Sequence, residues 1–503
     1  MPGIQDLSQF LLLSPEMLLS AAGLLLLLVG TWGRGFRNFD AAFVSIFSLI
    51  ATGVILVVVH SRSLDWGGRL ILGNTMVVDG FAFFWKALIL VATILTILIA
   101  YRFVEEGGYR GTELYALLLF ATAGAMFMVS GNTLLTIWIG LETMALASYI
   151  LAGYFKREVR SNEAALKYFI LGALSSGILL YGMSLLYGAT GTIELQRLAI
   201  ALAAQSASEP NILVPLGWIL MAAGLFFKIA AVPFHIWTPD VYVGAPTPIT
   251  AWLAVVSKGA SFAILVRIFY EGLWPVAVDW QWIVALVASA SMIWGNLAAL
   301  TQDNVKRLLA YSSIANAGYV LIGVLALSEM GLQSVLFYLL AYSFVTLGAF
   351  GTVILLERRE YAGETAADYA GLARRSPFLA AMMLLFLLAL TGIPLTGGFV
   401  GKLYLFAAAI EKGWTWVAVI GVVTSAISLY YYFRIVVYMY QRDETKTSPI
   451  PLRSPALVAV IAVCALLTLL LGIVPEPFLN MAEKSLEASQ LLQATQPVTT
   501  QLP

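Results

Sequence analysis

The chain has 503 residues, of which 60% are hydrophobic and only 11% are charged, and its formal net charge is zero. Soluble domains usually carry about 25% charged residues, so this composition excludes a soluble protein and indicates one that crosses a membrane many times. The zero net charge gives no support for nucleic-acid binding, and the single cysteine, Cys464, excludes an iron–sulfur cluster held by this chain alone, since such a cluster needs about four.

Apolar runs of about 20 residues predict an all-α polytopic fold of about fourteen membrane spans. The first run begins near Leu11 with no basic segment before it, so we expect an uncleaved span and not a signal peptide. The predicted spans cover residues 11–31, 40–60, 79–101, 112–130, 132–154, 164–188, 211–241, 247–270, 280–300, 306–327, 332–356, 377–410, 414–440 and 455–475.

The seventh and twelfth predicted spans are too long for one simple helix, and both contain helix breakers. Pro233 lies in the seventh span, and the twelfth contains Gly392, Pro394, Gly397 and Gly398. Proline removes a backbone donor and clashes with the preceding turn, and interrupted helices occur in membranes where protein buries them. We therefore expect each of these spans to consist of two half-helices joined by a short unwound segment.

The distribution of lysine and arginine predicts the orientation of the chain. The loops after odd-numbered spans hold sixteen of these residues, whereas the loops after even-numbered spans and the C-terminal tail hold five, namely Arg62, Arg69, Arg197, Lys412 and Lys484. The positive-inside rule places the odd-numbered loops in the cytoplasm and both termini on the outer side of the membrane.

The two interrupted spans lie five apart and therefore cross in opposite directions, which suggests an inverted repeat of five spans. Lys258 in the eighth span and Arg434 in the thirteenth fit the same offset, whereas the tenth span has no acid to match Glu142 in the fifth. We therefore divide the chain into an N-terminal three-helix segment (1–110), two antiporter-like five-helix repeats (111–272 and 273–441) and a C-terminal helix with its tail (442–503).

Four ionisable residues lie deep inside predicted spans, namely Glu142, Lys228, Lys258 and Lys402. A charge at the centre of a membrane costs at least about 2.5–3.5 kcal/mol, so such residues persist where the charge is paired, hydrated or used. Three lysines and one glutamate on four spans predict a path for protons or small cations.

Glu142 and Lys228 are candidates for a functional pair. An unpaired carboxylate as deep as Glu142 favours its neutral form, and a lysine from a neighbouring helix would restore its charge. Lys228 would load a proton when Glu142 approaches and release it when Glu142 retreats. The alternatives are structural, either an ion pair that locks two helices or, for Lys228, a side chain that snorkels to the interface.

Lys258 and Lys402 are expected to relay protons. Lys258 lies between Ser257 and Gly259, whose small size leaves room for water. Lys402 follows the glycine-rich break of the twelfth span, and a lysine beside unwound backbone is well placed to meet water from one side.

His235, Lys306 and Lys167 are weaker relay candidates. His235 lies in the break of the seventh span and would connect Lys228 to Lys258, since imidazole titrates near a pKa of about 6.5, or it is a core histidine. Lys306 opens the tenth span and is better explained as a positive-inside anchor than as a relay, with a place lining an exit as the alternative, and Lys167, near the cytoplasmic interface, is also explained as an anchor. Three further basic residues are expected to snorkel or to be structural charges, namely Lys86, Arg267 and Arg434.

Sequence motifs mark the region from the seventh to the twelfth span. Residues 227–242 read FKIAAVPFHIWTPDVY, followed by GAPTP at 244–248 and VVSKGA at 255–260. Residues 301–314 read TQDNVKRLLAYSSI, and GIP at 392–394 precedes GFVGK at 398–402. These motifs resemble the antiporter-like membrane subunits of respiratory complex I, the NADH-quinone oxidoreductase (NDH-1), and among them most closely the subunit N family. Val243 and Leu395 depart from the glutamate and the second proline that are usual in that family.

The resemblance implies a translocase subunit of a bacterial inner membrane, with both termini on the periplasmic side. It implies that FMN, iron–sulfur clusters, NADH and quinone bind to partner subunits, and that this chain holds no cofactor or metal. Its partners would be the antiporter-like and small hydrophobic membrane subunits and, indirectly, the peripheral redox arm. Glu142 and Lys228 match the family's central pair, Lys258 its internal relay and Lys402 its terminal, exit-side residue, and one cycle would move one proton outward.

Two rival functions are consistent with the same fold. A subunit of a multi-subunit Na⁺/H⁺ antiporter would share the lysines and need no redox partner, and a scaffold of a hydrogenase- or dehydrogenase-like membrane complex would use its charges as helix staples. Lys258 in the middle of the eighth span and the sequence of residues 233–242 favour the subunit N family over both. A scaffold explains three lysines against one acid poorly, because an unpaired buried charge is costly.

Overall fold

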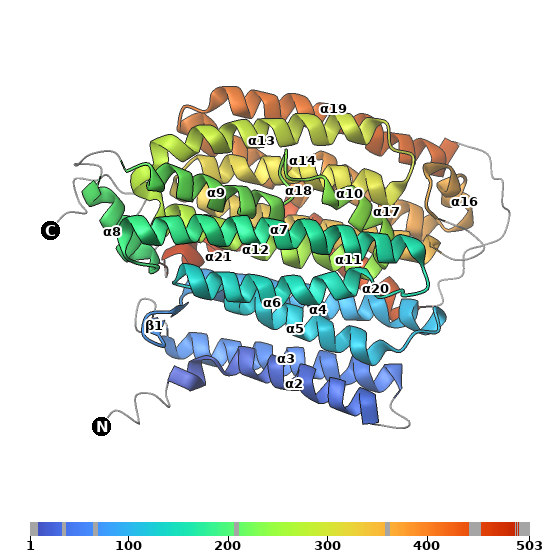
Figure 1. Ribbon diagram of the computed structural model, residues 1–503. Coiled ribbons are helices and arrows are strands. Elements are labelled where there is room, and N and C mark those ends of the chain that lie inside the picture. Colours follow the sequence, from blue (N-terminus) through green and yellow to red (C-terminus); the bar gives the residue numbers. More distant parts are fainter. Residues whose placement is uncertain are drawn as a thin grey trace.

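The computed structural model describes residues 9–32, 37–63, 69–205, 211–357, 363–441 and 454–487, together with Ser489 and Leu491. Its first part contains α2 (Ser14–Trp32), α3 (Asn38–Ser63), β1 (Arg69–Ile71), β2 (Met76–Val78), α4 (Gly80–Glu106), α5 (Gly111–Val129), α6 (Leu134–Ala152), α7 (Val159–Thr190), α8 (Leu195–Gln205), α9 (Leu213–Lys228), α10 (Trp237–Gly244), α11 (Thr247–Trp252) and α12 (Lys258–Arg267). Its second part contains α13 (Ala277–Leu300), α14 (Val305–Leu325), α15 (Glu329–Leu356), α16 (Leu372–Arg375), α17 (Pro377–Thr391), α18 (Gly397–Glu411), α19 (Thr415–Gln441), α20 (Pro455–Ile473) and α21 (Glu476–Glu487). The long helices run side by side, from α2 and α3 at one edge of the bundle to α13 and α19 at the other (Figure 1).

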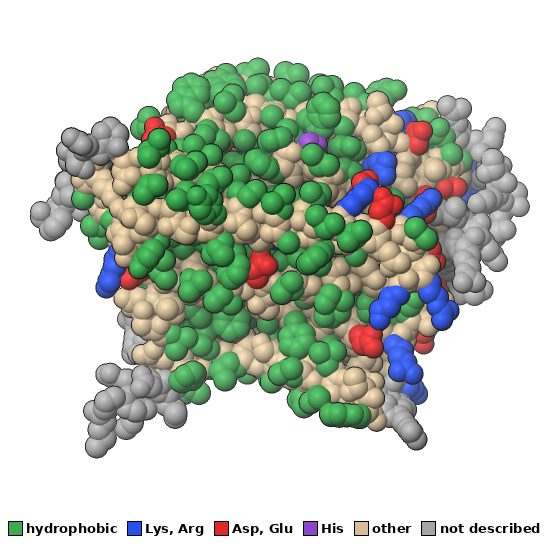
Figure 2. All heavy atoms as spheres, viewed as in Figure 1, with side chains coloured by type: hydrophobic (Ala, Val, Ile, Leu, Met, Phe, Trp, Pro, Cys, Tyr) green, Lys and Arg blue, Asp and Glu red, His purple; other side chains and the backbone are tan. Residues whose placement is uncertain are grey.

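Apolar side chains cover the outside of the bundle as well as its interior. Helices α14 and α15 are almost entirely buried, whereas α2, α3, α7 and α19 expose large apolar side chains such as Leu24, Phe47, Leu174 and Val422. Figure 2 shows apolar side chains across one face of the bundle, with most of the charged side chains gathered at one end. A soluble monomer rarely exposes so much apolar surface, whereas a chain in contact with lipid does.

Twelve helices in the described ranges are long and apolar enough to cross a membrane. They correspond to all the predicted spans except the seventh and the twelfth. At the seventh, α9 ends at Lys228 and α10 begins at Trp237, and at the twelfth, α17 ends at Thr391 and α18 begins at Gly397. The total of about fourteen spans therefore stays a prediction, since each of these two segments consists of shorter helices.

The segments that join these shorter helices adopt an unusual backbone. Ala230 between α9 and α10 has φ 60°, and Leu395 between α17 and α18 has φ 73°. Residues other than glycine rarely adopt a positive φ, so the surrounding structure must hold the backbone in this conformation. Part of that support is visible at the first break, where the indole N–H of Trp237 donates to the carbonyl of Phe227 at 3.1 Å.

The two ends of the bundle differ in character. We call the end that carries Arg110, Lys156 and Lys306 the basic end, and the end that carries β1, β2, α8 and α21 the hairpin end (Figure 1). Strands β1 and β2 pair antiparallel, with Leu70 opposite Val77. Strands of three residues are too short to show an alternating pattern, which is why none is predicted from the sequence.

Candidate functional site

Three of the predicted relay lysines lie where regular α-helix is interrupted. Lys228 is the last residue of α9, Lys258 follows the π-helical turn Leu253–Ser257, and Lys402 lies near the start of α18. All three are buried, with exposed fractions of 6%, 3% and 4% in that order. Helix interruptions leave backbone carbonyls unpaired, and Lys402 binds two carbonyls of this kind.

Lys228 contacts a tyrosine of α6. Its Nζ donates to Tyr149 Oη at 3.4 Å and lies 5.9 Å from the centroid of the tyrosine ring. Gly172 on α7 makes room for this ring, since a Cβ at Gly172 would lie 2.1 Å from Tyr149 Oη. Tyr149 therefore positions the buried ammonium. Gly172 leaves the space that the Tyr149 ring occupies.

The variant Gly172→Ala is expected to destabilise the purified protein by about 1–3 kcal/mol, because the added methyl group overpacks the contact with Tyr149. The matched control is Gly177→Ala on the same helix, where an added Cβ meets nothing within 4 Å. The measurement is the thermal unfolding midpoint of each variant. Equal midpoints for the two variants would contradict the positioning of Tyr149 by Gly172.

Glu142 lies seven residues before Tyr149, which places both side chains on one face of α6. The carboxylate lies within electrostatic range of Lys228, but Glu142 Oε1 has no hydrogen-bond partner in the described residues. The predicted pairing of Glu142 with Lys228 therefore stays a prediction, and Tyr149 is the side chain that contacts the ammonium.

Lys258 is held by α14. Its Nζ donates to the carbonyl oxygen of Ser313 at 2.9 Å and also to Ser313 Oγ. Tyr242 Oη lies 3.4 Å from the same Ser313 Oγ. The preceding π-helical turn widens the backbone, as the Lys258 N–H bonds to the carbonyl of Leu253 five residues earlier. Such π turns are frequent at functional sites, because they re-aim one side chain within a helix.

Lys402 binds the open end of α17. Its Nζ donates to the carbonyl oxygens of Leu390 at 3.0 Å and Thr391 at 2.9 Å, and to Ser425 Oγ at 2.9 Å. Gly392 ends α17 with φ 90°, which turns the chain away and leaves these carbonyls free to accept. The negative end of the helix dipole also favours a cation at this place.

Helix α14 contacts both Lys258 and Lys402. Lys402 Nζ lies 4.5 Å from the centroid of the Tyr319 ring, and Tyr319 is six residues, or about 9 Å, from Ser313 along α14. Asn316 lies between them and accepts a hydrogen bond from Tyr338 Oη. Ser313, Asn316 and Tyr319 are buried polar side chains of an apolar helix, and we call them the buried row. Sequence reasoning missed them, although serine, asparagine and tyrosine recur there at helical spacing.

Two weaker candidates have other partners. Lys167 Nζ lies 2.6 Å from both Asp240 Oδ2 and Glu163 Oε1, in a partly exposed group of ion pairs at the basic end. The ring of His235 packs edge-on against Trp294 of α13, with the centroids 6.3 Å apart. In the described ranges no hydrogen bond joins His235 to either of the lysines that it was predicted to connect.

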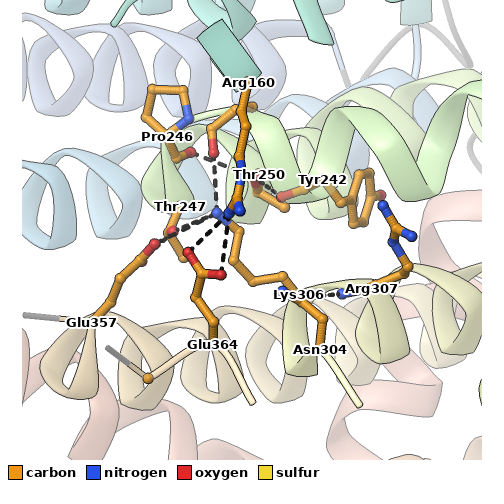
Figure 3. Close-up of polar contacts among 12 residues, drawn as sticks. Arg160, Tyr242, Pro246, Thr247, Thr250, Asn304, Lys306, Arg307, Glu357 and Glu364 are labelled. Atoms are coloured by element: carbon orange, nitrogen blue, oxygen red, sulfur yellow. Dashed lines mark hydrogen bonds and ion pairs between the residues drawn. The ribbon is translucent and has the colours of Figure 1, made fainter. Parts of the chain in front are cut away.

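Lys306 opens α14 and is buried in a polar corner at the basic end (Figure 3). Its Nζ donates to Thr247 Oγ1 at 2.9 Å and to the carbonyl of Ala245 at 3.2 Å, and lies 3.6 Å from Glu357 Oε1. Thr247 Oγ1 in turn donates to Glu357 Oε2. Lys306 therefore does not extend into solvent as an interfacial anchor would.

Two basic residues predicted to snorkel or to be structural charges are buried in ion pairs. Lys86 Nζ lies 2.5 Å from Glu16 Oε1. Arg267 donates to Asp79 Oδ1 at 3.0 Å and to Glu271 Oε1 at 2.8 Å. Removing one partner of a buried pair typically costs about 3–5 kcal/mol. The structural interpretation therefore holds for Lys86 and Arg267, and the snorkelling interpretation is wrong for them.

Comparisons with known proteins agree on one family. Residues 131–428 match the family described as NADH:quinone oxidoreductase/Mrp antiporter, transmembrane. The chain is 44% identical to NADH-quinone oxidoreductase subunit N 2 of Solibacter usitatus over 82% of this chain and 84% of that protein. It is 40% identical to NADH-quinone oxidoreductase subunit N of Trichlorobacter lovleyi over 94% of this chain and 96% of that protein.

Solved structures show the same likeness. A chain of respiratory complex I from Thermus thermophilus with bound aureothin is 33% identical, with a TM-score of 0.77 over 93% of this chain and 99% of that one. A chain of the Mrp complex from a Dietzia species has a TM-score of 0.83 at 23% identity, over 96% of this chain and 99% of that one. At that identity the second likeness shows the fold alone.

Proposed function

Because the chain belongs to the subunit N family of NADH-quinone oxidoreductases, we propose that it is the proton-translocating membrane subunit of such a complex. The observation that carries the mechanism is the buried row on α14, which contacts both Lys258 and Lys402. Electron transfer from NADH to quinone occurs in partner subunits, which hold the FMN, the iron–sulfur clusters and the quinone site. One cysteine and two histidines leave this chain poorly equipped for such centres.

The proposed transfer is controlled by Glu142 and Lys228. A conformational or electrostatic change in a partner subunit moves Glu142 toward or away from Lys228, which then holds or releases a proton. Tyr149 supports this step, because its hydroxyl contacts Lys228 from the helix that carries Glu142. Lys258, whose amine contacts the Ser313 hydroxyl, receives the proton. Lys402 then passes it toward the outer side of the membrane.

The weaker candidates have subordinate roles in this proposal. Lys306 lies at the basic end of α14, the helix that carries the buried row, so its position supports a role beside the place where protons enter. Lys167 shares Asp240 with Arg307, which supports a role in holding the basic end together. His235 would take part only after a movement that turns its ring away from Trp294.

The basic residues support an orientation with the basic end in the cytoplasm of a bacterial cell. The first described helix, α2, begins at the hairpin end, and α21 lies at that end as well (Figure 1). This is consistent with both termini on the periplasmic side of the inner membrane. Partners are the other antiporter-like and small hydrophobic membrane subunits and, indirectly, the peripheral redox arm. We propose no nucleic-acid partner.

Helix packing supports the inverted repeat of residues 111–272 and 273–441. Helix α5 packs on α6 so closely that a Cβ on Gly124 would lie 2.5 Å from the Met144 backbone nitrogen. Helix α13 packs on α14 in the same way, since a Cβ on Gly295 would lie 2.6 Å from the backbone nitrogen of Ala315. Each proposed repeat therefore opens with a helix pair in backbone contact, and each contains one interrupted segment.

The proposed function is tested by purifying the tagged chain from native membranes under gentle detergent conditions. We expect flavin, iron–sulfur clusters and NADH:quinone activity to co-purify, and NADH to drive proton uptake when the complex is reconstituted in vesicles. Co-purification with small hydrophobic subunits alone, together with cation-driven proton exchange, would instead establish an Mrp-type antiporter. Co-purification of a redox complex that moves no protons would favour the scaffold.

A further inference from the structure

Glu357 lies where the buried polar corner at the basic end meets solvent. It follows α15, and its side chain is 24% exposed while that of its partner Lys306 is 7% exposed. One carboxylate oxygen accepts from Thr247 Oγ1, and the other lies 3.6 Å from Lys306 Nζ (Figure 3). This carboxylate is therefore open to solvent and bonded to buried groups at the same time.

Side-chain hydroxyls lie at intervals between this corner and Lys258, and ordered water would have to connect them. Thr250 lies one turn after Thr247 and donates to the carbonyl of Tyr242 at 3.0 Å. The Tyr242 hydroxyl lies 3.4 Å from Ser313 Oγ, which contacts Lys258 Nζ. Along α14, Ser313 is seven residues after Lys306, so the two lie on one face about 10 Å apart. A distance of this size is within reach of side-chain hydroxyls and ordered water.

The other charged groups of the corner are less suited to take up protons. Lys306 has three N–H donors and three acceptors around it in the described residues, so its hydrogen-bonding capacity is filled by fixed partners. Glu364 pairs with Arg160, and both side chains are well exposed, at 45% and 71%. Asp240 is occupied by two basic partners at the surface.

On the basis of the proposed function, we propose that Glu357 is the carboxylate that takes up protons from the basic end and passes them to Lys258. Hydronium at the basic end gives a proton to the carboxylate: one of its O–H bonds breaks, water is left behind, and a carboxyl O–H bond forms. That O–H bond then breaks and an N–H bond forms on neutral Lys258, while Thr247, Ser313 and ordered water each accept one proton and donate another. The regenerated carboxylate takes up the next proton, and no electrons are transferred.

Lys306 is a positioning residue in this scheme. Its ammonium stabilises the carboxylate form of Glu357 after each transfer, since opposite charges 3.6 Å apart in a partly buried corner attract strongly. The carboxylate is thereby held facing Thr247 in a fixed geometry.

The test replaces Glu357 in the assembled complex and measures proton pumping in vesicles and NADH:quinone turnover, both per flavin so that assembly is accounted for. We expect Glu357→Gln to lower both rates by at least about threefold, since a positioned acid–base group typically contributes more than this, and Glu357→Asp to restore most of the loss. The matched control is Glu364→Gln, which makes the same change in the same corner and is expected to leave both rates unchanged.

Chemical rescue separates proton transfer from a structural role. Formate is a small weak acid that would reach the partly exposed site, and we expect it to raise the turnover of Glu357→Gln. A Glu357→Gln complex that pumps at the wild-type rate per flavin, or whose loss formate does not relieve, would overturn the inference. The proposed function fails separately, namely if Lys228→Met leaves pumping unchanged whatever the Glu357 variants do.

Discussion

Complexes that carry Lys228→Met are expected to pump protons about 100-fold more slowly than the wild type, since a positioned acid–base group typically contributes about 10²–10⁴-fold. Methionine is unbranched, apolar and of similar length, so it fills the space of the lysine while removing the amine. NADH:quinone turnover should fall as well, because redox chemistry and pumping are coupled. The measurement is NADH-driven acidification of vesicles that contain the purified complex.

The control for Lys228→Met is Lys156→Met at the basic end, where the side chain is exposed. It removes one amine from the same chain and is expected to change neither rate. If Lys228→Met pumps as well as this control, Lys228 is a structural cation and the proposed transfer through it is wrong.

The second large effect is expected at Lys402. Lys402→Ala removes the terminal relay and also leaves the carbonyl oxygen of Leu390 without the donor that Lys402 supplies, while the Thr391 carbonyl keeps Ser425 Oγ as a donor. We expect pumping per assembled complex to fall by at least about tenfold, and the complex to lose about 1–3 kcal/mol of stability from the unpaired Leu390 carbonyl. Both are measured on the same preparation, as proton yield and as thermal midpoint.

Lys412→Ala provides the matched control for this variant. Lys412 follows α18, the helix that carries Lys402, and its side chain is 43% exposed. It should change neither the proton yield nor the midpoint. A Lys402→Ala complex that is destabilised but pumps normally would assign Lys402 to helix packing alone.

Much of the fold follows from hydropathy alone. The predicted spans 112–130 and 132–154 differ by only a few residues from α5 and α6, because an uninterrupted apolar run of this length has few alternatives to a helix in lipid. The helix interruptions fall near Pro233 and between Gly392 and Gly397, where breakers are concentrated. The β1–β2 hairpin, α8 and α21 were not predicted, since they are too short or too polar to register as spans.

The sequence predicts the buried lysines of the candidate site but not the side chains that contact them. Buried lysines stand out because a charge inside an apolar run is costly. Their partners Tyr149, Ser313 and Ser425 do not, since hydroxyl residues are common in such helices and only packing decides which face meets which lysine. Glu357 follows the last residue of the eleventh predicted span and was taken as part of a loop.

The proposed mechanism requires that these buried lysines gain and lose protons during each cycle. Lys258 offers the most direct test, because it is buried, has one serine as its polar partner and lies in the middle of the proposed path. Arginine at this position keeps a positive charge but does not release its proton at any accessible pH.

The measurement is the number of protons moved per NADH by a complex that carries Lys258→Arg, with Lys258→Met beside it. If Lys258 relays protons, both variants should lose most of the wild-type yield, because neither side chain cycles between charged and neutral forms. A wild-type yield from Lys258→Arg would mean that a fixed charge suffices at this position, and it would contradict proton transfer through the buried lysines.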